Sequence, residues 1–181
     1  PLPPSPPPGH AGRAARRPGT PTRELLPFAP GSPETTARPS SKPDGTVWTW
    51  GYNGQSQLGD GSTTDRTSPV QVVGLSNVVA IAAGDRHTLA LKDDGTVWAW
   101  GYNFFGQLGA GPFDFTDRAT PVQVSGLTGV IAIVGGGKRS MALKDDGTVW
   151  AWGDVSNVSV DGTTASVSSV PIQVAGLADV V

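Results

Sequence analysis

From residue 44 onward, the pattern of apolar and polar positions changes over short segments. Trp98 and Trp100 are two positions apart, so in a strand their side chains lie on one face. Residues 78–83 (VVAIAA) are apolar at every position, which is typical of a strand covered on both faces. Asp94-Gly95 lies between two strand-like segments, and this dipeptide predicts a β-hairpin because glycine adopts a positive φ without steric penalty. The pattern predicts short antiparallel strands.

The same pattern recurs about every 50 residues. The motif DGTVW(T/A)WG begins at Asp44, Asp94 and Asp146, and PVQV or PIQV begins at Pro69, Pro121 and Pro171. Each unit is expected to contain four strands, opened by PVQV and followed by segments such as 78–83, 87–92 and 96–100. Four strands in a unit of this length predict an all-β fold of β-propeller blades. We expect units at 44–93, 94–145 and 146–181, the last of them partial.

All six tryptophans of the chain occupy two positions of this motif: Trp48, Trp50, Trp98, Trp100, Trp150 and Trp152. Large rings on one face, with alanines as small partners, suit sheets that stack face to face. We therefore interpret the tryptophans, together with Gly95, Gly147 and His87, as the structural signature of the repeat and not as a binding platform.

Residues 1–43 have a different composition. They contain 13 of the 17 prolines and few large apolar side chains. Proline fixes φ and lacks an N–H donor, so this segment is expected to be a disordered or polyproline-like tail. Its net charge is +4, whereas residues 44–181 carry −6.

No residue pattern indicates catalysis. The chain has no cysteine, which excludes a disulfide framework, a thiolate metal site and a cysteine nucleophile. His87 is the one histidine after residue 43, and its counterpart in the next unit is Arg139. Asp93-Asp94-Gly95 lacks the ligand spacing of a calcium loop, and in residues 134–140 (VGGGKRS) Arg139 stands where a phosphate-binding loop has Ser or Thr after the lysine. Gly135 to Gly137 with Lys138 and Arg139 indicate at most a minor anion site. We expect no enzyme activity, no catalytic residue, no cofactor and no metal.

The repeat resembles the regulator of chromosome condensation repeat family. The resemblance is carried by GQLG at 106–109, SQLG at 56–59, PVQV, GDRHTLAL at 84–91 and DGTVWAWG, and it covers residues 44–181. It implies a seven-bladed β-propeller, and this version of the repeat looks more like bacterial members than like the eukaryotic exchange factor. His87 occupies a position that the resemblance implies is structural, bridging strands.

The chain departs from a whole propeller in several ways. It holds just under three blades, whereas propellers have typically four to eight. The strand at 46–50 is expected to lack its hairpin partner, because the Pro-rich tail stands where that partner belongs. The loop after residue 153 has lost the GQLG signature. We expect a fragment or truncated product, or an assembly in which further blades of a longer chain or of other subunits close the ring.

One loop carries most of the phenylalanines. The segment from Gly101 to Pro121 is two residues longer than its counterpart from Gly51 to Pro69, and four of the five phenylalanines of the chain lie in it: Phe104, Phe105, Phe113 and Phe115. Aromatic side chains on a loop held by a rigid scaffold are typical anchors of protein interfaces. These residues are the candidate partner-binding site; the alternative is that the rings pack beneath the loop or on the next blade.

The leading functional hypothesis is a non-enzymatic protein-protein interaction module, with a protein partner and no direct contact to nucleic acid or membrane. The acidic repeat region disfavours phosphate binding, and no apolar run approaches the ~20 residues that span a bilayer. One alternative that the resemblance implies is guanine-nucleotide exchange on a small GTPase, which a GDP-release assay tests. Another is a secreted inhibitor of β-lactamase, which an inhibition assay tests. Light sensing is disfavoured, since Asp85 and Gly137 stand where the plant ultraviolet-B receptor of this fold has tryptophan.

Overall fold

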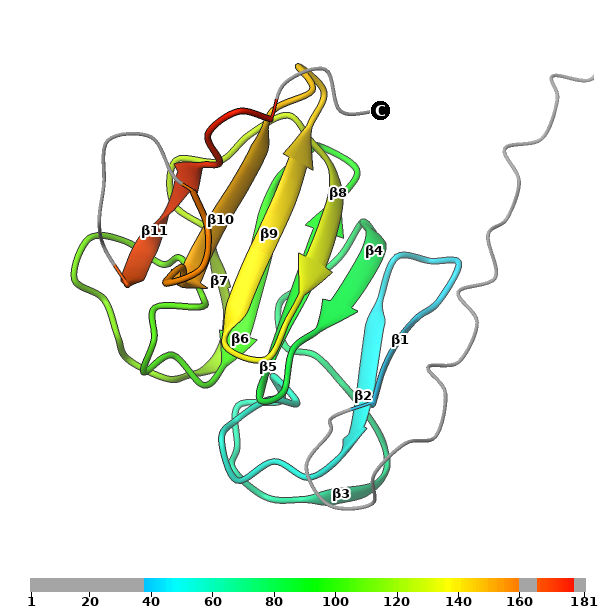
Figure 1. Ribbon diagram of the computed structural model, residues 1–181. Helices are drawn as coiled ribbons and strands as arrows, with labels where there is room; N and C mark the ends of the chain where they lie inside the picture. Colours follow the sequence, from blue (N-terminus) through cyan, green and yellow to red (C-terminus); the bar gives the residue numbers. More distant parts are fainter. Residues whose placement is uncertain (1–37, 160–165, 178–181) are drawn as a thin grey trace, which may run out of the picture.

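The computed structural model describes residues 38–159 and 166–177 (Figure 1). This part of the chain forms eleven strands: β1 (Arg38–Ser41), β2 (Val47–Gly51), β3 (Arg66–Gln71), β4 (Val78–Ala83), β5 (His87–Lys92), β6 (Val97–Gly101), β7 (Arg118–Gln123), β8 (Val130–Gly135), β9 (Arg139–Lys144), β10 (Val149–Asp154) and β11 (Val167–Gln173). They form three antiparallel sheets, ordered β1-β2-β3, β4-β5-β6-β7 and β8-β9-β10-β11. The predicted all-β fold of just under three blades is confirmed.

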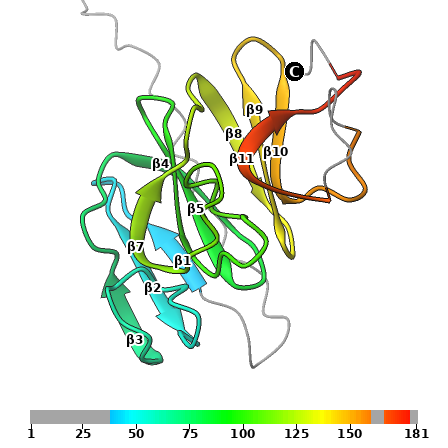
Figure 2. The ribbon, with the colours of Figure 1, turned by 90° about the vertical axis from the view of Figure 1, so that its left-hand side faces the viewer.

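The three sheets follow one another as neighbouring blades (Figures 1 and 2). Neighbouring blades approach each other through the strands at one end of each sheet, since β4 contacts β8, β5 contacts β8 and β1 contacts β4. β4 and β8 are therefore the innermost strands of their blades, and β7 and β11 are the outermost. The first blade has no counterpart of β4 or β8 among the described residues.

The predicted position of the PVQV strand within its sheet is wrong. We expected PVQV to open each sheet, but β7 closes the sheet of the preceding unit, with Trp98 opposite Gln123. β3 and β11 pair with β2 and β10 in the same way. The reason is the direction of the connections: the long loop after β6 returns the chain antiparallel to β6, and the Gly-Leu turn after β7 then leads into the next blade.

The strand at 47–51 does have a hairpin partner, contrary to the prediction. β1 pairs with β2, with Ser41 opposite Val47, so the expectation of a disordered tail fails for its last residues. The turn explains the pairing. Lys42 N–H donates to Thr46 O over 2.9 Å, as Lys92 N–H does to Thr96 O over 3.0 Å. The hairpin motif thus begins at the shared lysine and not at the Asp-Gly pair. Residues 1–37 lie outside the described part of the chain.

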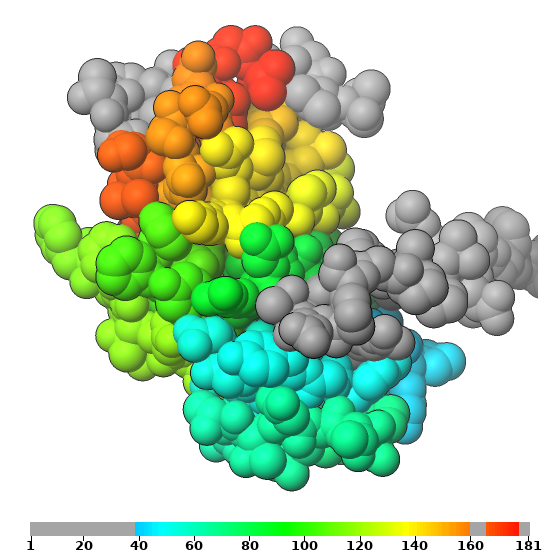
Figure 3. Space-filling view, turned by 60° about the horizontal axis from the view of Figure 1, so that its bottom comes forward, coloured from blue at the N-terminus to red at the C-terminus, as the bar shows by residue number. Residues whose placement is uncertain are grey.

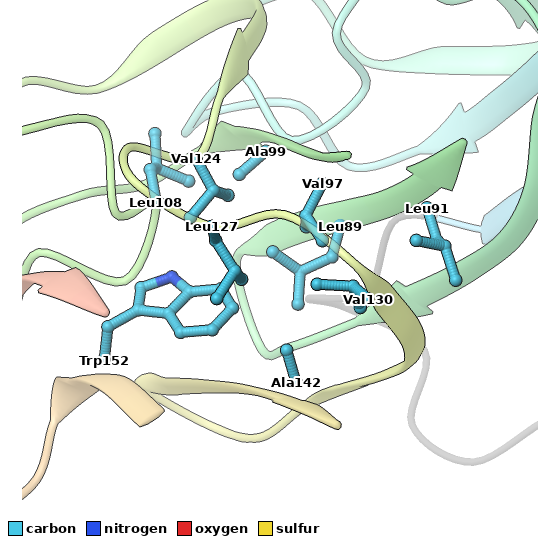
Figure 4. Close-up of a cluster of buried hydrophobic side chains, with 10 residues drawn as sticks. All are labelled: Leu89, Leu91, Val97, Ala99, Leu108, Val124, Leu127, Val130, Ala142 and Trp152. Carbon is cyan, nitrogen blue, oxygen red and sulfur yellow. The ribbon is translucent and has the colours of Figure 1, made fainter. Parts of the chain in front are cut away.

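The core consists of apolar clusters between the blades. The cluster between the second and third blades is drawn in Figure 4 and contains Leu89, Leu91, Val97, Ala99, Leu108, Val124, Leu127, Val130, Ala142 and Trp152. The cluster between the first and second blades contains Val47, Val72, Leu75, Val78, Ala90 and Trp100. In both clusters a tryptophan of the later blade is fully buried, with Trp100 and Trp152 each 0% exposed.

Each of these two tryptophans lies on the Gln-Leu-Gly segment of the preceding blade. Trp100 Nε1 donates a hydrogen bond of 2.9 Å to Gln57 O, and its ring lies against Gly59. The ring of Trp152 lies against Gly109 in the same way, since a Cβ at Gly109 would be 2.9 Å from its Cδ1 and Nε1. Gly109 also has a φ of +64°, which glycine adopts without strain. Glycine is thus required both for the turn and for the approach of the indole.

We predict that Gly109→Ala destabilises the chain more than Gly126→Ala does. Both glycines have a similar positive φ, +64° and +67°, so both substitutions introduce backbone strain of about 1 kcal/mol. Gly126 has open space around its missing Cβ, whereas Gly109 faces Trp152, so Gly109→Ala adds an overpacking cost of about 1–3 kcal/mol. Urea unfolding of both variants measures the difference, and equal losses of unfolding free energy would show that the indole does not press on this turn.

Candidate protein-interaction site

The loop between β6 and β7 is organised by one buried asparagine. Asn103 Oδ1 accepts a hydrogen bond of 2.9 Å from Leu108 N–H, and Asn103 Nδ2 donates one of 3.0 Å to Asp114 O. Asp117 Oδ1 accepts a hydrogen bond of 2.7 Å from Asn103 N–H. Asn53 makes equivalent bonds in the preceding loop, to Leu58 and Asp65 among others. These bonds join Asn103, at the start of the loop, to the middle of the loop and to its end.

A carboxylate near the loop tip adds a local ion pair. Asp114 Oδ2 pairs with Arg118 Nη2, and Asp114 Oδ1 accepts a hydrogen bond of 3.0 Å from Thr116 N–H. The Thr116 N–H and the Arg118 guanidinium lower the pKa of Asp114 below its ordinary value of 3.8, despite partial burial. A pair this exposed contributes about 0–1 kcal/mol, so its main effect is to fix the geometry of the tip.

The loop tip is also fixed by the next blade. Phe113 N–H donates a hydrogen bond of 2.9 Å to Ser169 Oγ on β11, a residue that is 7% exposed. Phe113 has a φ of +60°, a conformation that is unfavourable for a bulky side chain. Its own side chain is 89% exposed. The structure thus holds an apolar ring in water on a strained backbone, which is typical of functional positions.

The four predicted phenylalanines fall into two groups. Phe104 and Phe105 contact each other edge to face, at 5.3 Å between ring centroids, and both contact Tyr102. Phe113 and Phe115 make no ring pair within the described part of the chain. Phe104 is 67% exposed and Phe115 is 40% exposed, whereas Phe105 is half-buried. Phe104, Phe113 and Phe115 are therefore not buried beneath the loop. In Figure 3 the light-green atoms of this loop protrude from one side of the molecule.

Sequence reasoning missed Tyr102 and Lys138, which complete the first group. Lys138 Nζ lies 4.4 Å from the Phe105 ring centroid, a cation–π distance. Lys138 belongs to the β8–β9 turn of the next blade, so no local pattern signals this contact.

The surroundings of Lys138 and Arg139 do not favour the minor anion site that the sequence indicated at these two residues. Asp85 and Asp154 line the same shallow hollow as these two cations. Arg139 Nε donates a hydrogen bond of 2.6 Å to Asp154 O, so part of its donor capacity is already used. The two carboxylates offset the positive charge that an anion needs.

His87 lies between the second and third blades. It is 1% exposed, and its Nε2 lies 2.9 Å from Ser140 Oγ on β9. Ser140 Oγ donates a hydrogen bond of 2.7 Å to Gln107 O, so the neutral histidine donates from Nε2. A serine beside a histidine is also the arrangement of an activated nucleophile, but both residues are buried away from any substrate. The contact joins the two blades.

Burial lowers the pKa of His87 to about 4, from an ordinary value of 6.5. Between these values the unfolded chain binds the proton and the folded chain does not, so we predict that stability falls as pH drops from 6.5 toward 4. The expected loss of unfolding free energy is about 3 kcal/mol. Carboxyl groups with a lowered pKa, such as Asp114, affect the pH dependence of stability only below this pH range.

Denaturant unfolding across this pH range measures the effect. His87→Gln is expected to flatten the profile, and His10→Gln is the matched control that leaves it unchanged. A profile that depends on His10 instead would contradict the assignment.

Residues 38–159 and 166–177 contain no group of three or more His, Cys, Asp or Glu side chains placed to hold a metal ion. In the same part of the chain, no helix has the length and apolar character needed to cross a membrane.

Stacked four-stranded antiparallel sheets with a period of about 50 residues define the class of β-propeller repeat proteins. The sequence profile of the Regulator of chromosome condensation (RCC1) repeat matches residues 44–91 and 94–143. A second profile of the same repeat matches residues 78–107 and 130–158. The chain belongs to the RCC1 repeat family, as the resemblance implied.

Comparisons with individual proteins agree with this family assignment. The chain is 31% identical over 137 residues to the RCC1 domain-containing protein RUG3, mitochondrial, of Arabidopsis thaliana, covering 72% of this chain and 30% of that protein. Human WBSCR16 superposes with a TM-score of 0.67 at 22% identity, covering 78% of this chain and 37% of the other. Prp20p of Saccharomyces cerevisiae superposes with a TM-score of 0.65 at 23% identity, covering 79% and 37%. The two structures show the fold, and the chain spans about a third of the length of each of these proteins.

Proposed function

We propose that this chain is a non-enzymatic protein-protein interaction module that contacts its partner through the loop between β6 and β7. Phe113 and Phe115 are the proposed anchors, with Phe104 and Phe105 beside them. The observation that carries the proposal is Phe113, which is 89% exposed although its N–H bonds to Ser169 Oγ and the carbonyl of the adjacent Asp114 accepts a hydrogen bond from Asn103.

A fixed loop backbone favours binding for a physical reason. Association costs free energy when it must order a mobile loop at the interface. The hydrogen bonds of the Phe113 loop order its backbone before any partner arrives. Aromatic anchors that enter a partner's pocket also contribute much of the binding energy in known interfaces.

We predict that Phe113→Ser with Phe115→Ser abolishes capture of the partner in a pull-down and leaves the melting temperature unchanged. Ile131→Ser is the matched control, because Ile131 is 57% exposed and lies on β8, outside the loop. Capture is expected to persist in this control. A large fall in melting temperature of the double variant would instead support packing of the two rings on the fold.

We also propose that further blades, from a longer chain or from other subunits, cover the open faces of the outer blades. Trp50 is partly exposed, whereas Trp100 and Trp152 are buried by the blade before them. On the third blade, Met141 and Leu143 are likewise only partly buried at the face away from the second blade.

Nucleotide exchange on a small GTPase is the second candidate function. It is supported by the similarity of fold to Prp20p, a protein described by its binding properties to Gsp1p and histones. Fold similarity alone is a weak guide to activity. Measurement of GDP release from a small GTPase tests this candidate, and the absence of acceleration would exclude it for the GTPase tested.

A further inference from the structure

Tyr102, Phe104 and Phe105 form a cluster of three rings, here called the aromatic platform, in which Phe104 is exposed and the other two rings are half-buried. The rings of Tyr102 and Phe104 are near parallel, at 13° between planes and 6.3 Å between centroids. Phe105 meets both of them at steep angles, 63° and 77°. Lys138 Nζ lies 4.4 Å from the Phe105 centroid and holds that ring against the next blade. Phe104 is 67% exposed.

The Pro-rich tail joins the fold on the face that carries the platform. Arg38, the first residue of β1, pairs with Trp50 near the end of β2. β6 is the counterpart of β2 in the next blade, and its last residue, Gly101, directly precedes Tyr102. The ends of β2 and β6 lie at the same edge of adjacent stacked blades. The point where the tail enters the fold and the aromatic platform therefore lie on the same face of the molecule.

We propose that the aromatic platform binds a polyproline-type segment, and that its occupant in this chain is residues 1–8, PLPPSPPP. Six of these eight residues are proline. The spacing Pro-x-x-Pro occurs from Pro1 to Pro4, from Pro3 to Pro6 and from Pro4 to Pro7. Polyproline helices dock on surfaces lined by aromatic rings, and they lose little entropy on binding because their conformation is already restricted.

The connection to the fold favours an occupant from the same chain. Residues 9–37 link the segment to β1, and even part of their extended length, at about 3.1 Å per residue, spans the width of a small domain. Tethering raises the effective concentration of the segment to about the millimolar range, so weak docking becomes populated. The proposal does not depend on Phe113 or Phe115, which lie outside the platform.

Photo-crosslinking in the full chain tests this docking. Phe104 is replaced by p-benzoylphenylalanine, which keeps an aromatic ring at the same position, and crosslinked peptides are mapped by mass spectrometry after irradiation. We expect an intramolecular crosslink from position 104 to residues 1–8, in a species with the mass of one chain. Substitution of Pro3, Pro4, Pro6 and Pro7 by Ser is expected to lower its yield at least five-fold. The same crosslinker at Ile131, on β8 of the third blade, is the control and is expected to give no crosslink to the tail.

Three outcomes would overturn the proposal. They are a crosslinked dimer in place of the intramolecular product, crosslinks from position 104 to other parts of the chain only, and a yield that is unaffected by the proline substitutions. None of these outcomes bears on the Phe113 and Phe115 pull-down, so failure of this proposal is distinguishable from failure of the proposed function.

Discussion

The contact between a tryptophan of one blade and the Gln-Leu-Gly segment of the blade before it is the constraint on which the rest of the structure depends. Trp100 donates to Gln57 O and lies on Gly59, and the Trp152 ring lies on Gly109. A single four-stranded sheet has two faces and no core of its own, so each blade buries its apolar face only against a neighbour. The repeated tryptophan places one large ring at each of these two junctions.

The same junctions determine which loops are ordered. The segment that receives Trp152 is also part of the loop organised by Asn103, and the outer strand of the third blade supplies Ser169 to the tip of that loop. His87 reaches Ser140 across the junction, and Ser140 in turn contacts Gln107 O. The loop that carries Phe104 and Phe113 is thus held in place by the packing of two blades. A surface held in this way suits recognition of a partner, because little of it must be ordered on binding.

Features set by local sequence could be predicted, and features set by contacts between distant segments could not. The Asp-Gly hairpins and the tryptophan pairs follow from backbone geometry and strand periodicity, and both were correct. The assignment of PVQV to the wrong sheet arose because sequence order does not show which of two flanking strands a segment joins. β1 was missed because Arg38–Ser41 has neither apolar alternation nor β-branched residues, and its pairing follows from the Lys42 turn. The pairing of Lys138 with Phe105 required the neighbouring blade.

Native-state hydrogen exchange of the chain with Trp152→Ala tests the dependence of the blades on one another most directly. If the sheets are stable only when stacked, removal of this ring lowers the exchange protection of β5 and β6 together with that of β9 and β10, by about the same free energy. Loss of protection confined to β8–β11, with β4–β7 unchanged, would show that the second blade is stable without this contact and would contradict the dependence.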